Sequence, residues 1–287
     1  MSDLLWQTQL AKWVFRACEL EVNSPKPGNV SPGCEFSNAS VSDFLKSAAE
    51  ISPELALAGE RSLGETILAA VTATQRAVGH NTNLGIVLLL SPLAAIPPEQ
   101  SLFDGIGPIL QATTVEDSRD VYAAIRLAQP AGLGNAQEQD LNEAPTIALR
   151  GCMEIAADRD MIARQYANGF HDVLNRGLEW LRESQKHQKT LALQIQWLAV
   201  RLLAEYGDSL IERKCGRDMS DQVRDMAKDL LSADWLVRPE SRRVYDQFDQ
   251  FLRADGHRRN PGTTADLVAA ILFSALREGW QLQDRIP

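Results

Sequence analysis

The segment 79–92, GHNTNLGIVLLLSP, constrains the fold of this chain more than any other. Its apolar part, residues 84–90, has no polar face, so it must be buried on every side as a core helix or a central strand. It is far shorter than the roughly 20 residues that cross a bilayer. Asn81 or Asn83 in the polar part is a natural helix N-cap. Two interpretations are open: a capped core helix, or an anion site at the free N–H groups of its first turn.

The N-terminal residues predict a helix over 3–22, because apolar side chains recur at the spacing of one helical face. This stripe also carries Glu21, and an acid on an apolar face must be paired, bound to a metal or placed at the edge of a cavity. The loop that follows, residues 23–33, contains three prolines and two glycines and is therefore rigid. Lys26 lies between two of these prolines. We expect its side chain either to reach a phosphate or to be an ordinary solvated lysine.

The rest of the chain is also predicted to be helical, with Gly and Pro marking the helix ends. Helices are expected over residues 41–51, 60–78, 115–129, 190–206 and 267–276, with two or three more within 146–180. Ser52-Pro53 should end the second helix, and residues 92–107 should form a loop around a short helix. No segment alternates like a strand, and no repeat of 20 to 50 residues is present. The prediction is an all-α protein, one compact domain over residues 1–287 with roughly a dozen helices.

Two further polar segments are candidates for chemistry. In the segment 207–216, GDSLIERKCG, a helix would place Asp208 and Glu212 on one face, where they could share Mg²⁺. The alternative is a capping Asp208 in a solvated turn. In the segment 258–267, RRNPGTTADL, a rigid turn leads into an apolar helix. Thr263 and Asp266 approximate a capping box, and the functional interpretation is a second helix N-terminus directed at the same ligand.

The composition excludes some functions. Lys and Arg total 29 and Asp and Glu total 38, giving a net charge of −9, so the chain lacks the basic footprint of a nucleic-acid-binding protein. An anionic nucleotide could still bind through local positive groups or Mg²⁺. The four cysteines lie far apart without a CxxC pair, which is typical of reduced cytoplasmic thiols. Without a signal peptide or a membrane segment, we expect a cytoplasmic protein that binds small molecules.

Four motifs now stand in order along the chain: PKPGNV (25–30), NTNLG (81–85), DSLIERKCG (208–216) and NPGTTADL (260–267). Together they resemble the triphosphoribosyl-dephospho-CoA synthase family, and the similarity runs from about residue 21 to residue 273. The resemblance implies an all-α enzyme that uses Mg²⁺ and ATP. Such an enzyme joins the ribose C1 of ATP to the 2′-hydroxyl of dephospho-CoA and releases adenine.

This chain departs from the pattern of the better-known members. Asn83 and Leu84 stand where those enzymes have His and Lys, and SLIERKCG and NPGTTAD replace NLLHRGG and NPGGSAD. The chain resembles a shorter branch of the family found in methanogens and methylotrophs. One alternative is therefore a nucleotide- or phosphoribosyl-dependent step in the synthesis of a one-carbon carrier of the tetrahydromethanopterin type. The other is a nucleotide-binding protein without catalytic activity.

The candidate residues fall into four roles in such a transfer. Breaking a ribose–adenine bond develops positive charge on the sugar, which carboxylates stabilise, and a base must accept the hydroxyl proton. The general base is predicted to be Glu21 or Asp266. Mg²⁺ is predicted to be bound by Asp208 with Glu212 or Glu65. Phosphate is predicted to be bound by Lys26, Arg213 and Lys214. The nucleotide is predicted to be oriented by Asn81, Asn83 and Asn260.

Overall fold

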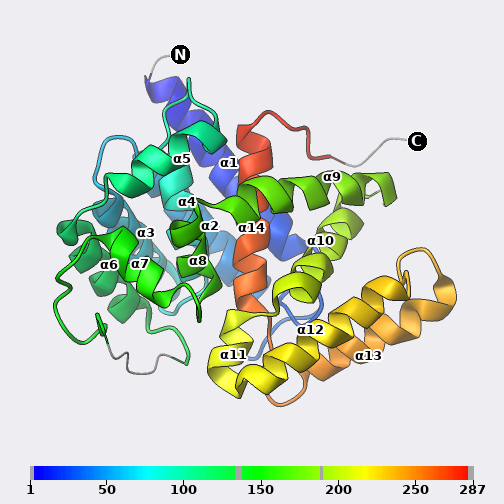
Figure 1. Cartoon of the computed structure of the whole chain (residues 1–287). Coiled ribbons are helices and arrows are strands. Elements are labelled where there is room, and N and C mark those ends of the chain that lie inside the picture. Colours follow the sequence, from blue (N-terminus) through cyan, green and yellow to red (C-terminus); the bar gives the residue numbers. More distant parts are fainter. Residues whose placement is uncertain (1–2, 133–137, 188–189, 284–287) are drawn as a thin grey trace.

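The apolar segment after Asn83 forms helix α4 (Leu84–Ala94), and every residue of this helix is buried. Helix α14 (Gly262–Arg277) is similarly embedded, with eleven buried residues between Thr263 and Ala275. α4 and α14 pack against each other, and α1 (Asp3–Asn23) packs against α14. Figure 1 shows α14 running through the middle of the molecule with α1, α4 and α8 around it. The core is therefore organised around two helices that begin with sequence motifs.

The computed structural model describes residues 3–132, 138–187 and 190–283, and over these residues the chain is all-α, as predicted. They contain fourteen α-helices, one π-helical and one 3₁₀ segment, and no strand, since their only β-bridges are two isolated ones within residues 31–39. The remaining elements are α2 (Val41–Ala56), α3 (Leu63–Val78), α5 (Leu102–Gln111), α6 (Val115–Ala128), α7 (Leu149–Ala156), α8 (Met161–Asn168), η1 (Asp172–Gly177), α9 (Leu178–His187), α10 (Leu191–Tyr206), α11 (Ser209–Cys215), α12 (Arg217–Ser232), η2 (Pro239–Ser241) and α13 (Arg242–Arg253).

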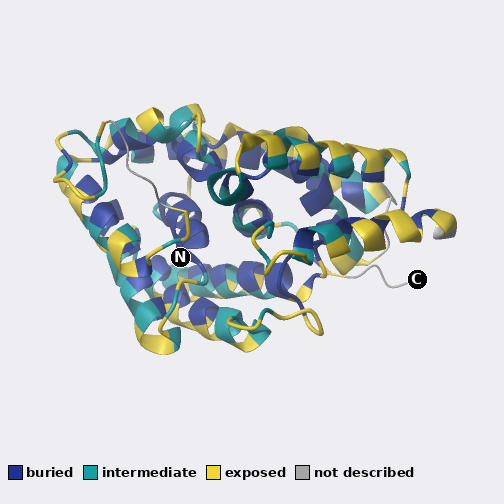
Figure 2. Cartoon of the chain, turned by 90° about the horizontal axis from the view of Figure 1, so that it is seen from below, coloured by how far each residue is buried: buried dark blue, intermediate teal, exposed yellow. Residues whose placement is uncertain are grey.

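Buried apolar side chains form two clusters. The larger one surrounds α4 and α14, and the smaller one lies between α10, α12 and α13. Helix α10 contributes to both, through Leu198 to the larger cluster and Leu203 to the smaller. Figure 2 shows the buried positions on the inward sides of the helices and exposed positions on their outer sides. The double role of α10 supports the predicted single domain, which stays a prediction.

Two predicted helix boundaries were wrong. Helix α2 continues through Pro53 to Ala56, because Ile51 and Leu55 on either side of the proline are fully buried. Burial of these side chains outweighs the single backbone hydrogen bond that a proline removes. Helix α5 is the short helix expected within residues 92–107, but it continues through Pro108 to Gln111. Buried residues of α5 recur every four positions, at Leu102, Ile106 and Leu110, and the last of these lies beyond Pro108.

The predicted capping box at the start of α14 was also wrong. The helix begins at Gly262, and Pro261 occupies the N-cap position without a side-chain cap. The Thr263 hydroxyl instead lies 3.1 Å from that of Ser209. Helix α14 takes its capping carboxylate from a distant part of the chain, as described below, and this frees Asp266 to face a cavity.

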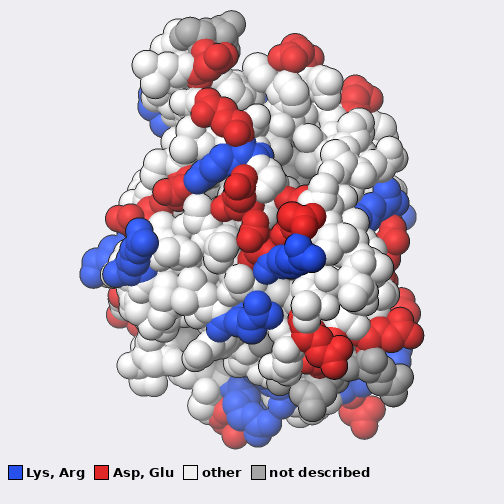
Figure 3. Space-filling model, turned by 90° about the vertical axis from the view of Figure 1, so that its left-hand side faces the viewer, with Lys and Arg blue, Asp and Glu red and all other residues white. Residues whose placement is uncertain are grey.

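The surface carries no large field of one sign on the face drawn in Figure 3, where acidic and basic side chains are interspersed among uncharged ones. This distribution agrees with the net charge of −9 and with the absence of a basic footprint in the sequence. None of the helices in the described ranges is long and apolar enough to cross a membrane.

Candidate active site

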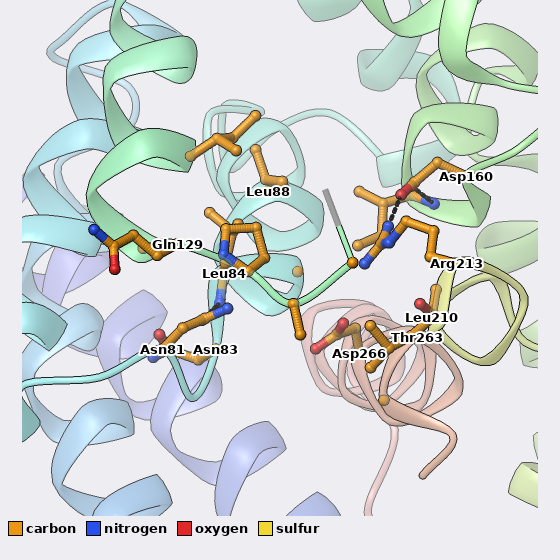
Figure 4. Close-up of a pocket in the computed structure, with 18 of the residues that line it drawn as sticks. Asn81, Asn83, Leu84, Leu88, Gln129, Asp160, Leu210, Arg213, Thr263 and Asp266 are labelled. Carbon is orange, nitrogen blue, oxygen red and sulfur yellow. Dashed lines mark hydrogen bonds and ion pairs between the residues drawn. The ribbon is translucent and has the colours of Figure 1, made fainter. Parts of the chain in front are cut away.

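A cavity of about 790 Å³ opens where the N-termini of α4 and α14 meet. Its walls come from α1, α6, α7, α8 and α11 and from the loops at residues 29–39, 79–83 and 256–260. In the view of Figure 4, Asn81 and Asn83 lie on one side, Asp160 and Arg213 on the other, and Asp266 between them. Seven of the eleven predicted site residues line it: Glu21, Asn81, Asn83, Arg213, Lys214, Asn260 and Asp266.

The four motifs are joined by direct contacts at the start of α14. The Asn29 side-chain amide donates to the carbonyl of Pro261 at 3.1 Å, which ties the first motif to the fourth. Lys214 Nζ donates to Asn260 Oδ1 at 2.8 Å, which ties the third to the fourth. The second motif meets α14 at Gly85, where an added Cβ would lie only 2.0 Å from Asp266 Oδ2. Residues far apart in sequence thus form one site.

Asp208 is fully committed to hydrogen bonds within the protein. Its Oδ1 accepts from the backbone N–H groups of Leu210 and Ile211, at 2.9 and 3.1 Å, and so caps α11. Its Oδ2 accepts from both the backbone N–H and the hydroxyl of Thr264, each at 2.8 Å, in the first turn of α14. Burial raises the pKa of Asp208, and these hydrogen bonds oppose that rise. A carboxylate offers about four acceptor sites, so the predicted magnesium ligand has none left for a metal.

The other two predicted metal ligands do not reach the cavity. Glu65 Oε2 accepts from the backbone N–H of Ser62 at 3.1 Å in an exposed capping box of α3. Glu212 lies on α11 outside the cavity lining. Among the residues that the structure describes, no group of three or more His, Cys, Asp or Glu side chains could hold a metal ion. The three predicted carboxylates therefore do not fit a shared metal site, because two of them serve as helix caps.

Lys26 is neither solvated nor free to reach a phosphate. Only 1% of the residue is exposed, and its Nζ lies 2.9 Å from Glu21 Oε1. The same ammonium donates to the backbone carbonyls of Glu21 and Ser24. The loop turns inward here because Gln196 and Tyr245 both donate to the carbonyl of Pro25. Of the three environments predicted for Glu21, the structure shows two, because Glu21 pairs with Lys26 and also lines the cavity.

The N-terminus of α4 presents free donors to the cavity. Asn81 Oδ1 accepts from the backbone N–H of Leu84 at 3.0 Å, whereas Asn83, at the N-cap position, makes no capping hydrogen bond. The N–H groups of Gly85 and Ile86 donate to no residue in the described part of the chain. Asn83 is buried and accepts from the Thr74 hydroxyl, but its Nδ2 has no partner among these residues. Such donors at a helix start suit an anionic ligand.

The opposite wall combines two cationic side chains with a carboxylate that the sequence interpretation missed. Arg213 forms an ion pair with Asp160, and its buried Nε has no partner in the described residues. Asp160 also caps α8 by accepting from the N–H groups of Ile162 and Ala163 at 2.8 and 3.1 Å. Burial lowers the pKa of Lys214. An aspartate before an apolar helix signals a cap, but nothing in the sequence indicates its pairing with an arginine 53 residues away.

Asp266 lies at the start of α14 and lines this cavity without a partner among the described residues. It forms no hydrogen bond or ion pair with any residue in the described ranges. Burial raises its pKa well above the ordinary value, the negative charges of Glu21, Asp208 and Asp160 add to this rise, and Arg213 opposes it. The cavity thus combines cationic groups and free N–H donors with the paired carboxylates of Glu21 and Asp160 and the unpaired carboxylate of Asp266. This set of groups suits a transfer in which a phosphorylated sugar develops positive charge.

Comparison with known proteins points to the same chemistry. Residues 7–284 match the family model of ATP:dephospho-CoA triphosphoribosyl transferase. Among solved structures, the chain is similar to a candidate triphosphoribosyl-dephospho-CoA synthase from Archaeoglobus fulgidus, with 28% sequence identity and a TM-score of 0.66. That alignment covers 84% of this chain and 99% of the other. No curated protein sequence matches the chain.

Proposed function

The chain belongs to the ATP:dephospho-CoA triphosphoribosyl transferase family and is a transferase, and from this premise we propose the reaction that it catalyses. ATP donates its triphosphoribosyl group to the hydroxyl of a dephospho-CoA-like acceptor, and adenine leaves. The observation that carries the proposal is the convergence of four motifs on one cavity at the start of α14. A cavity of about 790 Å³ lies within the usual size range of ligand sites.

The triphosphate is proposed to bind between the α4 N-terminus and α11. The free N–H groups of Gly85 and Ile86 and the unpartnered Asn83 amide supply donors on one side. Arg213 and Lys214 supply positive charge on the other. Asn81 and Asn260 would then orient the ribose or base, since both line the cavity. Lys26 has no free N–H for a phosphate, so its predicted direct contact is not part of this proposal.

Magnesium dependence is proposed from the substrate. Mg²⁺ in nucleotide sites keeps several waters and is bound largely by phosphate oxygens with one or two carboxylates. Asp208, Glu212 and Glu65 do not fit as a shared ligand set, as their contacts show. We therefore assign no protein ligand to the ion and no catalytic step to it. One of the cavity carboxylates, Glu21 or Asp266, is proposed to accept the proton of the attacking hydroxyl.

We propose that Asn83 and Leu84 form the part of the site where acceptor recognition differs from that of the family members that use dephospho-CoA, because both residues line the cavity. A cytoplasmic location is also part of the proposal. Its support is that all four cysteines are free thiols in the structure, as expected in a reducing compartment.

The test is adenine release from Mg-ATP in the presence and absence of dephospho-CoA. The proposal expects adenine only when both are present, and expects Asn83→Ala to lower the rate. The matched control is Asp104→Asn, which changes an exposed carboxylate that accepts from the Ser101 hydroxyl in the first turn of α5, outside the cavity, and should keep the wild-type rate. Adenine formed without an acceptor would indicate hydrolysis of the glycosidic bond instead. ATP binding without turnover with any acceptor tested would support a non-catalytic protein and overturn the proposal.

A further inference from the structure

Glu21 has an environment that stabilises a charged carboxylate at the cavity wall. Its Oε1 is 2.9 Å from Lys26 Nζ, and both side chains are almost completely shielded from solvent. The ammonium's three N–H groups are all used, by this carboxylate and by the carbonyls of Glu21 and Ser24. Lys26 therefore pairs with Glu21 and fixes its position without touching the space where a ligand would lie.

Asp266 has the opposite environment. No cation forms an ion pair with it in the described structure, and its Oδ2 packs against Gly85 at the start of α4. The charged groups that act on it come from three neighbouring helices: Glu21 of α1, Asp160 at α8, and Asp208 and Arg213 at α11. Three of these four are acidic. Burial and these acids keep its pKa well above the ordinary range, so Asp266 retains its proton at higher pH than a solvated aspartate.

Glu21 and Asp266 are also close to each other. Both line the same cavity, the negative charge of Glu21 acts on Asp266, and both carboxylates add to the effect of burial in raising the pKa of the Cys18 thiol on α1. Two acidic groups in one site with different partners commonly divide the roles of acid and base. The transfer needs both roles, because the hydroxyl must lose a proton and the purine must gain one.

We propose that Glu21, held by Lys26, accepts the proton of the attacking hydroxyl, and that Asp266 donates a proton to the leaving purine. This division rests on the proposed function and assigns each carboxylate its own step. The C1–N9 bond of the nucleotide breaks with its electron pair moving to the base, which takes the proton of Asp266. The acceptor oxygen forms the new bond to C1, and its proton passes to Glu21. Solvent then returns a proton to Asp266 and removes one from Glu21.

The experiment compares ATP with an analogue methylated at N7 of adenine, whose base leaves without taking up a proton. Asp266→Asn should lower kcat with ATP by about 10²–10⁴-fold, the usual contribution of an acid catalyst, but by only about tenfold or less with the analogue. Glu21→Gln should lower kcat with both donors. In the wild type, kcat/KM with ATP should fall as the pH rises through the pKa of Asp266, and this alkaline fall should be absent with the analogue.

The positioning role of Lys26 has a separate readout. Lys26→Met removes the ion pair that holds Glu21 in place, so kcat should fall towards that of Glu21→Gln while the KM for ATP changes little. A purely structural role would lower the melting temperature without lowering the kcat of the folded variant. If Lys26→Met does not fold, the double variant Lys26→Met/Glu21→Gln removes both charges. It should fold and show the same low kcat as Glu21→Gln, and a higher kcat would overturn the assignment.

The outcomes separate this inference from the proposed function. If the wild type releases adenine but Asp266→Asn is equally slow with both donors, the transferase reaction stands and the division of roles is wrong. The division is also wrong if Glu21→Gln regains the wild-type kcat when the analogue replaces ATP. If the wild type releases no adenine from either donor with dephospho-CoA, the proposed reaction fails and the division fails with it.

Discussion

Gly85 lies where the second and fourth motifs pack closely against each other. It is the second residue of α4, and a Cβ built on it would lie 2.0 Å from Asp266 Oδ2 and 2.8 Å from Ile162 Cδ1. Carbon atoms in proteins do not approach an oxygen so closely, so either the carboxylate or the helix would have to move. The glycine is therefore needed for the close approach of α4 to α14, which brings the free N–H groups next to Asp266.

We predict that Gly85→Ala destabilises the protein by roughly 1–3 kcal/mol, the usual cost of overpacking. In an open helical position the same change would stabilise it by up to about 1 kcal/mol. Gly107→Ala is the matched control, because Gly107 lies in α5 with nothing within 4 Å of an added Cβ. Urea denaturation of both variants measures the difference. A Gly85→Ala variant as stable as Gly107→Ala would contradict the close packing against Asp266.

Asp266 gives a prediction for stability against pH. Its pKa is raised in the folded protein, so its protonated form favours folding, and that contribution is lost as the pH rises through the folded pKa. Asn resembles the protonated acid. We therefore predict that Asp266→Asn has a higher melting temperature than the wild type at neutral to alkaline pH, by about 2–4 °C for each kcal/mol of stabilisation. The difference should disappear below the ordinary pKa of aspartate.

The control for this experiment has the opposite sign. The pKa of Asp225 is lowered by its hydrogen bond and ion pair with Lys228, on the exposed side of α12. Its stabilising effect is present above the ordinary aspartate pKa and is lost as the pH falls. Asp225→Asn should therefore leave the melting temperature slightly lower at neutral pH and unchanged in acid. If both variants changed in the same direction, the assignment of a raised pKa to Asp266 would be wrong.

At the scale of the helices, the sequence predicted the features that follow from the spacing of apolar residues. It missed the features that depend on contacts with distant segments of the chain. The all-apolar run predicted that residues 84–90 are buried, as they are in α4. For the acid on the apolar stripe of α1 the sequence left pairing, a metal or a cavity edge open, and the structure shows Glu21 paired and at a cavity edge. A partner five residues away, Lys26, was within reach of that reasoning. The cap of α14 was not, because it comes from Asp208, 56 residues earlier in the chain. The continuation of α2 through Pro53 was equally invisible, since tertiary burial decides it.

Asp208 joins two helix starts, and removing it should affect both. We predict that Asp208→Ala lowers the free energy of unfolding by roughly 2–4 kcal/mol, because two caps are lost and buried N–H groups are left without acceptors. Ser101→Ala removes the single exposed cap of α5 and should cost only about 1 kcal/mol. Equal losses in chemical denaturation would show that Asp208 does not connect α11 and α14.

The same aspartate also tests the predicted metal site. Asp208→Asn keeps one acceptor oxygen and should lower stability in the absence of any ligand. Below its unfolding temperature, however, the Mg²⁺ dependence of ATP binding should match that of the wild type, because the carboxylate is already saturated. Isothermal titration with and without Mg²⁺ measures this. Loss of the Mg²⁺ dependence would restore Asp208 as a metal ligand and contradict the structural interpretation.

At the scale of the whole molecule, the site is assembled from segments that begin near residues 25, 81, 208 and 260 and meet only in the folded chain. The first of these segments is held from outside the cavity. The backbone N–H of Gly28 donates to Asp249 of α13, and Arg253 donates to the carbonyl of Asn29, at 2.8 and 2.9 Å. The smaller apolar cluster, to which α13 belongs, thus supports the loop that carries Lys26 and positions Glu21. Ligand binding should therefore depend on the folding of both clusters.

We predict that Mg-ATP stabilises the entire chain rather than one segment. At a ligand concentration of 100 times the Kd, the free energy of unfolding should rise by about 2.7 kcal/mol, and the melting temperature should rise by about 2–4 °C per kcal/mol. Hydrogen exchange should slow in all four motifs with the same dependence on ATP concentration. Arg253→Gln, which loosens the loop from α13, should weaken this protection in the other three motifs as well. Protection limited to the residues around α4 would show that ATP binds to the helix N-terminus alone, and that the cavity does not act as one site.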